Sequence, residues 1–146
     1  MTTTQVRVLQ EYSALEYILL GDLCDLLDEP GDKTTTKWLI AILDALLETL
    51  PREFDLEEQD GYLSEVTDGR PYWSTKIEGL RCEHEKLFAK LQMLREELVQ
   101  QSSFTRIARE VRTELRDWID RLIDHEHRET GLLQESVNLD IGGESG

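Results

Sequence analysis

The chain has 146 residues, of which 39% are hydrophobic, so its length fits a single domain with its own apolar core. Its 31 acidic and 16 basic side chains give a formal net charge of −15, which repels phosphate backbones and anionic lipids. Metal ions or a cationic protein partner therefore fit better than nucleic acid or a membrane surface, and MTTTQVRV, which lacks a signal-peptide pattern, predicts a cytoplasmic protein.

Four long segments carry apolar residues at helical spacing, and none shows the strict alternation of a β-strand. Four helices of similar length with short connections are typical of an all-α, antiparallel up-down-up-down four-helix bundle. We predict this bundle over residues 1–135. Its helices are expected over about residues 4–28, 36–63, 72–101 and 103–135.

Proline, glycine and serine mark the ends and interruptions of these helices. A Pro-Gly pair at 30–31 ends the first helix, and a serine pair at 102–103 offers N-caps for the last. Pro51 lies inside the second helix and predicts a kink or a short break, because proline removes one backbone hydrogen bond. The tail 136–146, SVNLDIGGESG, is too rich in glycine to extend the last helix, and we expect it to fold back or to remain mobile.

Ionisable side chains interrupt the apolar stripes that steps of three and four residues trace along each helix. His125 and Glu129 continue the stripe of the last helix, whereas His127 lies about 200° around that helix and is expected in water. The predicted inward faces are, in the first helix, Val8, Tyr12, Leu15, Leu19 and Leu26, with Glu16 one turn from Tyr12; in the second, Leu39, Leu43, Leu46, Leu50, Glu53 and Glu57; in the third, Ile77, Leu80, His84, Leu87 or Phe88, Leu91, Leu94 and Leu98; and in the fourth, Phe104, Ile107, Val111, Leu115, Trp118, Leu122, His125, Glu129 and Leu132.

Antiparallel topology brings these polar positions to one end of the bundle. The first and third helices carry them near their starts, and the second and fourth near their ends, so at a rise of about 1.5 Å per residue they could share one layer. Buried carboxylates without lysine or arginine are costly, and a metal cation would supply the missing charge. The candidate ligands are His84, His125, Glu129, Glu57, Glu53 and Tyr12.

The donor types narrow the choice of metal. Imidazole nitrogen together with carboxylate oxygen favours iron, manganese or zinc, so we expect one or two iron ions, with manganese or zinc as alternatives. Glu53 would bridge two metal ions or complete the ligand shell of one. Tyr12 would donate a hydrogen bond to a bound species or act as a ligand itself.

Motifs on three of the predicted helices resemble those of hemerythrin-like cation-binding domains. The resemblance covers nearly the whole chain and includes the segment LLQESVNLDIG, which is similar to the tail of some bacterial members. It implies a four-helix bundle with a non-haem, usually dinuclear, iron site used for oxygen binding, for sensing oxygen or iron, for iron handling or for responses to nitric oxide. The motifs are Glu83-His84 followed by Leu87, His125-x-x-x-Glu129, and Phe54-x-x-Glu57-Glu58-x-x-Gly61-Tyr62-Leu63.

Three positions depart from the pattern of that family. Tyr12 stands where the family has its first-helix histidine, Glu53 where it has the histidine of the second-helix pair, and Phe88 where a second histidine follows His84. Two histidines and three carboxylates resemble di-iron carboxylate oxidases and ferritins more than an oxygen carrier. No residue identifies a substrate, which favours a binding role over an enzyme.

Two other functions stay open at this point. The departures also fit a bundle that has lost its metal and serves as an acidic interaction or regulatory module for a basic partner protein. In that case Glu53 and Glu57 would face water through a rotation of the helix after Pro51, and His84 would be a hydrogen-bonded core histidine. A simple buffer of divalent cations is the third function.

Other chemistries lack a motif in this chain. No glycine-rich loop precedes a helix at phosphate-binding spacing, and the three histidines come without the motifs that accompany Ser-His-Asp or Cys-His catalysis. Cys24 and Cys82 have no CxxC spacing, so they indicate neither a disulfide framework nor a zinc knuckle and are expected in the core. Trp38, Trp73 and Trp118 are expected there as well.

Overall fold

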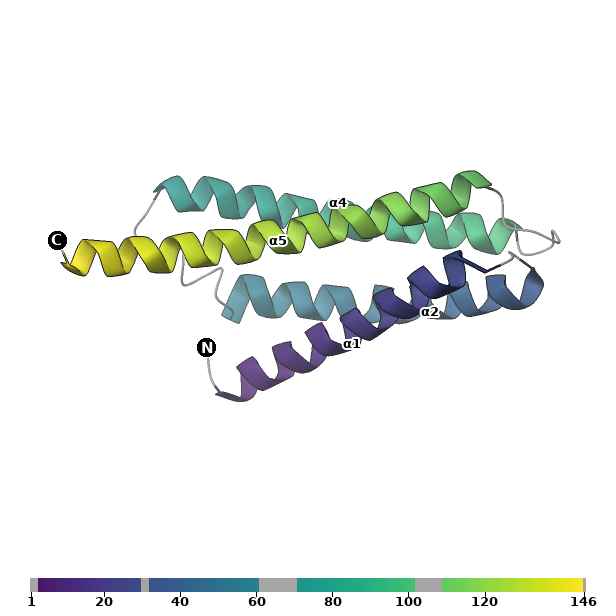
Figure 1. Cartoon of the computed structure of the whole chain (residues 1–146), viewed down its shortest axis with the longest axis horizontal. Coiled ribbons are helices and arrows are strands. Elements are labelled where there is room, and N and C mark those ends of the chain that lie inside the picture. Colours follow the sequence, from purple (N-terminus) through teal and green to yellow (C-terminus); the bar gives the residue numbers. More distant parts are fainter. Residues whose placement is uncertain (1–2, 30–31, 61–70, 102–108, 146) are drawn as a thin grey trace.

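The computed structural model describes residues 3–29, 32–60, 71–101 and 109–145, and within these ranges the chain is all helical. The elements are α1 (Thr3–Leu27), α2 (Lys33–Asp55), the π-helical turn η1 (Leu56–Asp60), α4 (Pro71–Gln101) and α5 (Arg109–Ser145). The long helices extend along one common axis, and the start of α1 and the end of α5 lie toward the same end of the molecule (Figure 1). Helix α1 packs on α2, α2 on α4, and α4 on α5, while α1 makes a smaller contact with α5. The predicted all-α class is confirmed.

The junction between α1 and α2 is fixed by capping at both helix ends. Asp32 is the N-cap of α2, and its carboxylate accepts a hydrogen bond of 2.9 Å from the backbone N–H of Thr35. The carbonyl oxygen of Leu27, at the end of α1, accepts hydrogen bonds from Arg112 and Arg116 of α5 at 3.1 and 2.9 Å. These guanidinium groups satisfy a carbonyl that a helix end leaves without a partner, and they attach the end of α1 to α5.

Helix α2 passes through Pro51 without the break that was predicted there. The α-helical hydrogen-bonding pattern continues to Asp55, and the change of geometry comes after it, in the π-helical turn η1. Leu50 and Phe54 are buried on either side of Pro51, so packing holds the helix together despite the missing N–H group. The wider turn of η1 carries Glu57 and Glu58. The predicted end of this helix near Leu63 lies outside the described residues.

A polar layer separates two apolar clusters in the core. On α4, His84 lies between Leu80 of the smaller cluster and Leu87 of the larger one, and on α5 the polar pair His125 and Glu129 lies between Leu122 and Leu132. The inward faces predicted for α2, α4 and α5 are buried as expected wherever the structure describes them. The smaller cluster consists of Trp73, Ile77, Leu80 and Leu132, and the larger one includes Leu23, Leu27, Leu39, Leu43, Leu46, Leu50, Leu91, Leu94, Leu98, Leu115 and Trp118.

The face predicted for α1 is only partly correct, because Leu19 and Leu26 pack against the core but are not its most buried residues. Leu15 is 40% exposed, and the buried residues of α1 are instead Glu16, Leu20, Leu23 and Leu27. Apolar residues surround most of this helix, so spacing alone supports more than one stripe, and contact with α2 and α5 selects among them. Three further residues expected in the core are exposed, namely Trp38 on α2 and the two cysteines, Cys24 and Cys82.

The helix end predicted near residue 135 is wrong, because α5 continues as a helix to Ser145. Two consecutive glycines cost about 1 kcal/mol each in a helix. An existing helix can meet this cost, since each added residue gains a backbone hydrogen bond without a new nucleation step. The predicted N-caps at 102–103, and Phe104 and Ile107 after them, lie outside the described residues. In the described ranges, no helix combines the length and the apolarity that crossing a bilayer requires.

Candidate metal centre

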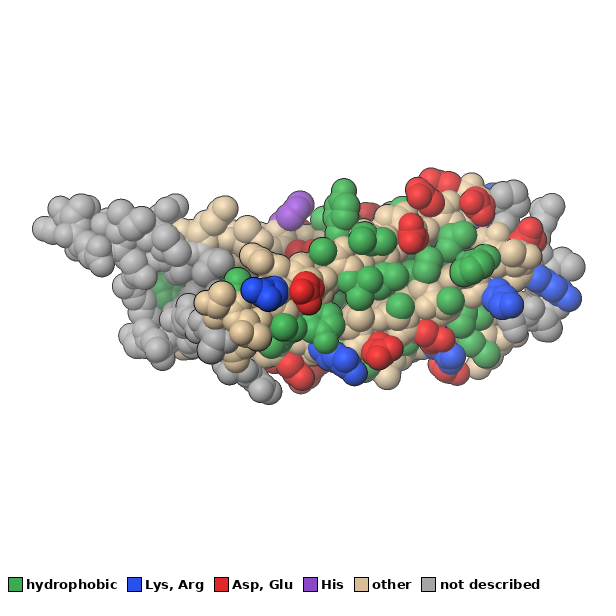
Figure 2. Space-filling view, turned by 90° about the horizontal axis from the view of Figure 1, so that it is seen from below, with side chains coloured by type: hydrophobic (Ala, Val, Ile, Leu, Met, Phe, Trp, Pro, Cys, Tyr) green, Lys and Arg blue, Asp and Glu red, His purple; other side chains and the backbone are tan. Residues whose placement is uncertain are grey.

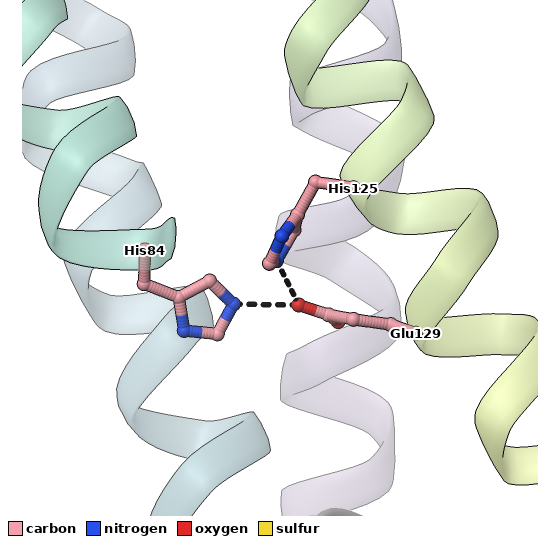
Figure 3. Close-up of side chains that lie close together, drawn as sticks. All are labelled: His84, His125 and Glu129. Atoms are coloured by element: carbon pink, nitrogen blue, oxygen red, sulfur yellow. Dashed lines mark hydrogen bonds and ion pairs between the residues drawn. The ribbon is translucent and has the colours of Figure 1, made fainter. Parts of the chain in front are cut away.

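Two buried histidines converge on one carboxylate oxygen in the polar layer (Figure 3). The Nε2 atom of His84, on α4, lies 2.6 Å from Oε1 of Glu129, on α5. The Nε2 atom of His125, one turn before Glu129, is hydrogen-bonded to the same oxygen. The two imidazole centroids are 4.6 Å apart, and all three side chains are at least 97% buried. We call these three residues the histidine cluster.

The opposite nitrogen of each ring is held by a carboxylate outside the histidine cluster. Nδ1 of His84 lies 2.6 Å from Oε1 of Glu58, and Nδ1 of His125 lies 2.6 Å from Oε2 of Glu83. Glu83 in turn pairs with Arg128, one residue before Glu129. Histidines that bind metals commonly donate their second N–H group to a carboxylate in this way, which fixes the tautomer and the orientation of the ring.

Phe54 of α2 covers one face of His84. The two rings are stacked, with centroids 3.8 Å apart and an angle of 5° between their planes. Phe54 also lies edge-on to His125, at a centroid distance of 6.3 Å. This aromatic ring excludes water from the histidine cluster and limits the orientations that His84 can adopt.

Glu57 adds a second carboxylate beside the histidine cluster. Its Oε2 atom lies 3.6 Å from Nε2 of His84, is buried, and has no hydrogen-bond partner. Burial and the negative charge of Glu129 raise the pKa of Glu57 to about 11. In the absence of a cation Glu57 therefore stays protonated and donates a hydrogen bond to Glu129. A metal ion that displaced this proton would gain a second anionic ligand.

The histidine cluster holds Glu129 ionised in spite of its burial. Burial alone would raise the pKa of Glu129, but the hydrogen bonds from His125 and His84 lower it well below the ordinary range. Burial would also lower the pKa of His125, and the hydrogen bonds and charges of Glu129 and Glu83 outweigh it and raise that pKa. The two carboxylates that contact His125 thus stabilise its cationic form.

Three more carboxylates meet beside this cluster, on α1, α2 and α5. Glu16, Glu53 and Glu126 each have a carboxylate oxygen within 4.8 Å of the others. We call them the carboxylate cluster. Burial is the main cause that raises the pKa of Glu16 to about 11 and of Glu53 to about 7, and neighbouring carboxylates add to both shifts. Ser13 donates a hydrogen bond of 3.1 Å to Oε1 of Glu53.

The predicted ligands therefore fall into three groups. His84, His125 and Glu129 form the histidine cluster with Glu57 beside it. Glu53 is buried as predicted but belongs to the carboxylate cluster. Tyr12 joins neither cluster, because its half-buried side chain instead accepts a hydrogen bond from Arg52 on the surface of α2.

Four residues of the polar layer are not among the ligands that the sequence predicts. Glu58 and Glu83 stand in the resemblance motifs, but their spacing does not reveal that they would hold the Nδ1 atoms of the histidines. Glu16 is one turn from Tyr12 and takes the inward position that Tyr12 was expected to fill. Glu126 lies beside the predicted stripe of α5 and faces α1, which only the packing of these two helices decides.

Comparison with known proteins adds no relative. No family model, no curated protein and no solved structure matches this chain.

Proposed function

We propose that this protein binds a metal cation at the histidine cluster, with non-haem iron as the first candidate and manganese or zinc as alternatives. His84, His125, Glu129 and Glu57 would be the ligands. One observation carries the proposal: two buried imidazoles direct their Nε2 atoms to one carboxylate oxygen, while a further carboxylate holds the Nδ1 atom of each ring.

The charges of the layer support a cation. Within the described part of the chain, no lysine or arginine is buried, whereas Glu16, Glu53, Glu57 and Glu129 are. The metal-free layer balances these acids with protons, and a divalent cation would replace protons at Glu57 and at the histidines. Nitrogen and oxygen donors together suit iron, manganese and zinc better than magnesium or calcium, which prefer oxygen alone.

The role that we propose for the bound metal is the sensing or handling of oxygen, nitric oxide or iron. The resemblance to hemerythrin-like domains supports this role. We also propose an antiparallel up-down-up-down order of the helices, which is typical of bundles with short connections. When bound, iron would supply a redox-active centre that can take a small ligand. The chain's own residues would orient the imidazoles through Glu58 and Glu83 and exclude water with Phe54.

A metal-free interaction module is the second candidate, and the surface of α1 and α2 favours it. Large apolar side chains are exposed there, including Tyr17 at 81%, Trp38 at 59% and Ile18 at 57%. Figure 2, which views this face, shows apolar side chains gathered beside acidic ones. Such a surface suits a basic amphipathic partner. In the metal-free core, protonation of Glu57 and Glu16 would remove the negative charge of these two buried carboxylates.

Elemental analysis of the full chain, purified without an affinity tag or chelator, tests the proposal. We expect stoichiometric metal that is lost in His84→Ala and in His125→Ala and kept in the control His127→Ala, because His127 is exposed on the same helix. The visible absorption spectrum should identify iron. An absence of metal, together with a thermal midpoint that neither chelator nor added iron moves, would leave the interaction module as the function.

A further inference from the structure

The carboxylate cluster lies in a cleft between α1 and α5. The cleft has a volume of about 800 Å³, which admits a hydrated cation, since one water takes up roughly 30 Å³. Besides Glu16, Glu53 and Glu126, its lining includes Glu57 and Glu129. Among the described residues that line this cleft there is no lysine or arginine.

Two oxygens of the carboxylate cluster are buried without a partner. Glu16 and Glu53 are each only 4% exposed, and neither Oε1 of Glu16 nor Oε2 of Glu53 has a hydrogen bond. The other contacts of the cluster are a hydrogen bond between Glu16 and Glu126 and the one that Ser13 donates to Glu53. A buried carboxylate oxygen without a partner costs about 1 to 3 kcal/mol, and more if it is charged, so this arrangement needs a compensating ligand.

From these contacts we infer that Glu16, Glu53 and Glu126 form a second cation site, made of oxygen donors alone, which takes a hard divalent cation such as Mn²⁺ or Mg²⁺. Three helices supply one carboxylate each, and water in the cleft would complete the coordination shell. The inference goes beyond the proposed function, because the carboxylate cluster shares no ligand with the histidine cluster and offers no nitrogen. The two sites should therefore differ in the metals that they select.

A titration with Mn²⁺ on the chelator-treated full chain tests this inference, with free Mn²⁺ measured by its electron paramagnetic resonance signal. We expect Glu16→Gln and Glu126→Gln each to weaken one class of Mn²⁺ binding by at least about tenfold, since even an indirect partner of a metal contributes that much. Glutamine keeps the size of a protonated glutamate, so the fold should persist. The matched control is Glu11→Gln, an exposed glutamate of α1, which should bind Mn²⁺ as the wild type does.

The variant His84→Gln/His125→Gln separates this inference from the proposed function. It should keep the Mn²⁺ that Glu16→Gln loses, even if elemental analysis finds that no metal occupies the histidine cluster. The inference is overturned if the wild type binds no Mn²⁺, if Glu16→Gln and Glu126→Gln bind it normally, or if the histidine variant loses all of it. If circular dichroism shows that Glu16→Gln does not fold, Mn²⁺ binding by Glu126→Gln decides the test, because Glu126 is only half-buried.

Discussion

The histidine cluster and the carboxylate cluster are neighbours that differ in how completely their polar atoms are hydrogen-bonded. In the histidine cluster all four ring nitrogens have a carboxylate partner, and Glu129 accepts from both rings. In the carboxylate cluster Glu16 and Glu53 each keep a buried oxygen without a hydrogen bond. The difference teaches that the histidine cluster is preorganised by its outer partners, whereas the carboxylate cluster depends on a proton or a cation.

The helices that carry the two clusters also differ in how closely they pack against their neighbours. Helices α4 and α5 supply the histidine cluster from faces that continue an apolar stripe on both sides. The carboxylate cluster instead needs α1, whose contact with α5 is small and whose flank forms the wall of a cleft. Solvent and ions can therefore reach the carboxylate cluster through this cleft, which Glu129 also lines, whereas neither His84 nor His125 lines it.

Removal of Glu129 should have the largest effect, because this carboxylate joins both histidines. In chelator-treated protein we expect Glu129→Ala to lower the free energy of unfolding by about 3 kcal/mol, the cost of breaking a buried pair. Glu126→Ala, three residues earlier and half-buried, should cost less than about 1 kcal/mol. Urea unfolding followed by circular dichroism measures both. Equal losses of unfolding free energy in the two variants would mean that the hydrogen bonds of the histidine cluster stabilise the fold no more than the contacts of the carboxylate cluster do.

The stability of the metal-free protein should fall as pH rises. In the unfolded chain Glu16, Glu53 and Glu57 titrate near their ordinary value of 4.5, whereas folding raises their pKa to about 11, 7 and 11. The unfolded chain thus loses protons first, and the stabilisation present below pH 4.5 is lost progressively above it. Glu129 has a lowered pKa, so its contribution is lost only toward more acidic pH.

Unfolding at about pH 5 and about pH 8, with chelator and with saturating metal, measures this dependence. We expect the metal to reduce or reverse the decline, because it binds the ionised carboxylates and becomes more stabilising as pH rises. A metal-free protein that gained stability between these two pH values would contradict the burial of protonated Glu16, Glu53 and Glu57.

Glu83→Gln tests whether outer partners order the histidine cluster. This carboxylate holds Nδ1 of His125 and pairs with Arg128, so its loss should weaken metal binding at the histidine cluster by about 10- to 100-fold. The control is Glu85→Gln, an exposed glutamate two residues further along α4. Competition with a chromophoric zinc chelator gives both affinities. An unchanged zinc affinity in Glu83→Gln would show that His125 does not need the hydrogen bond to Glu83 in order to bind metal.

Ser13→Ala should have the smallest effect and act only on the carboxylate cluster. The hydroxyl donates to Glu53, and a net hydrogen bond contributes about 1 kcal/mol, so Mn²⁺ binding should change by about fivefold. Zinc binding at the histidine cluster should stay the same in the competition assay. A change of equal size in both assays would indicate that the two clusters bind metal as one unit.

Most of the polar layer could be predicted from sequence because the helices α2, α4 and α5 have one clear apolar stripe each. His84, His125, Glu129, Glu57 and Glu53 interrupt those stripes, and all are buried. The first helix could not be oriented in this way, since apolar residues surround most of it and Leu15 competes with Leu23 for the inward position. The glycine content of residues 136–146 does not reveal the extent of α5, because an existing helix can continue through two glycines.

The sequence by itself determined that the chain is helical and which positions on three helices are buried, because helical periodicity places such residues on one side. Only the tertiary structure decided that Glu16 rather than Tyr12 reaches the layer, that Glu58 and Glu83 hold the histidines, and that Glu126 faces α1. These contacts join different helices. They depend on the rotation of each helix about its own axis against its neighbours, which packing fixes and residue spacing does not.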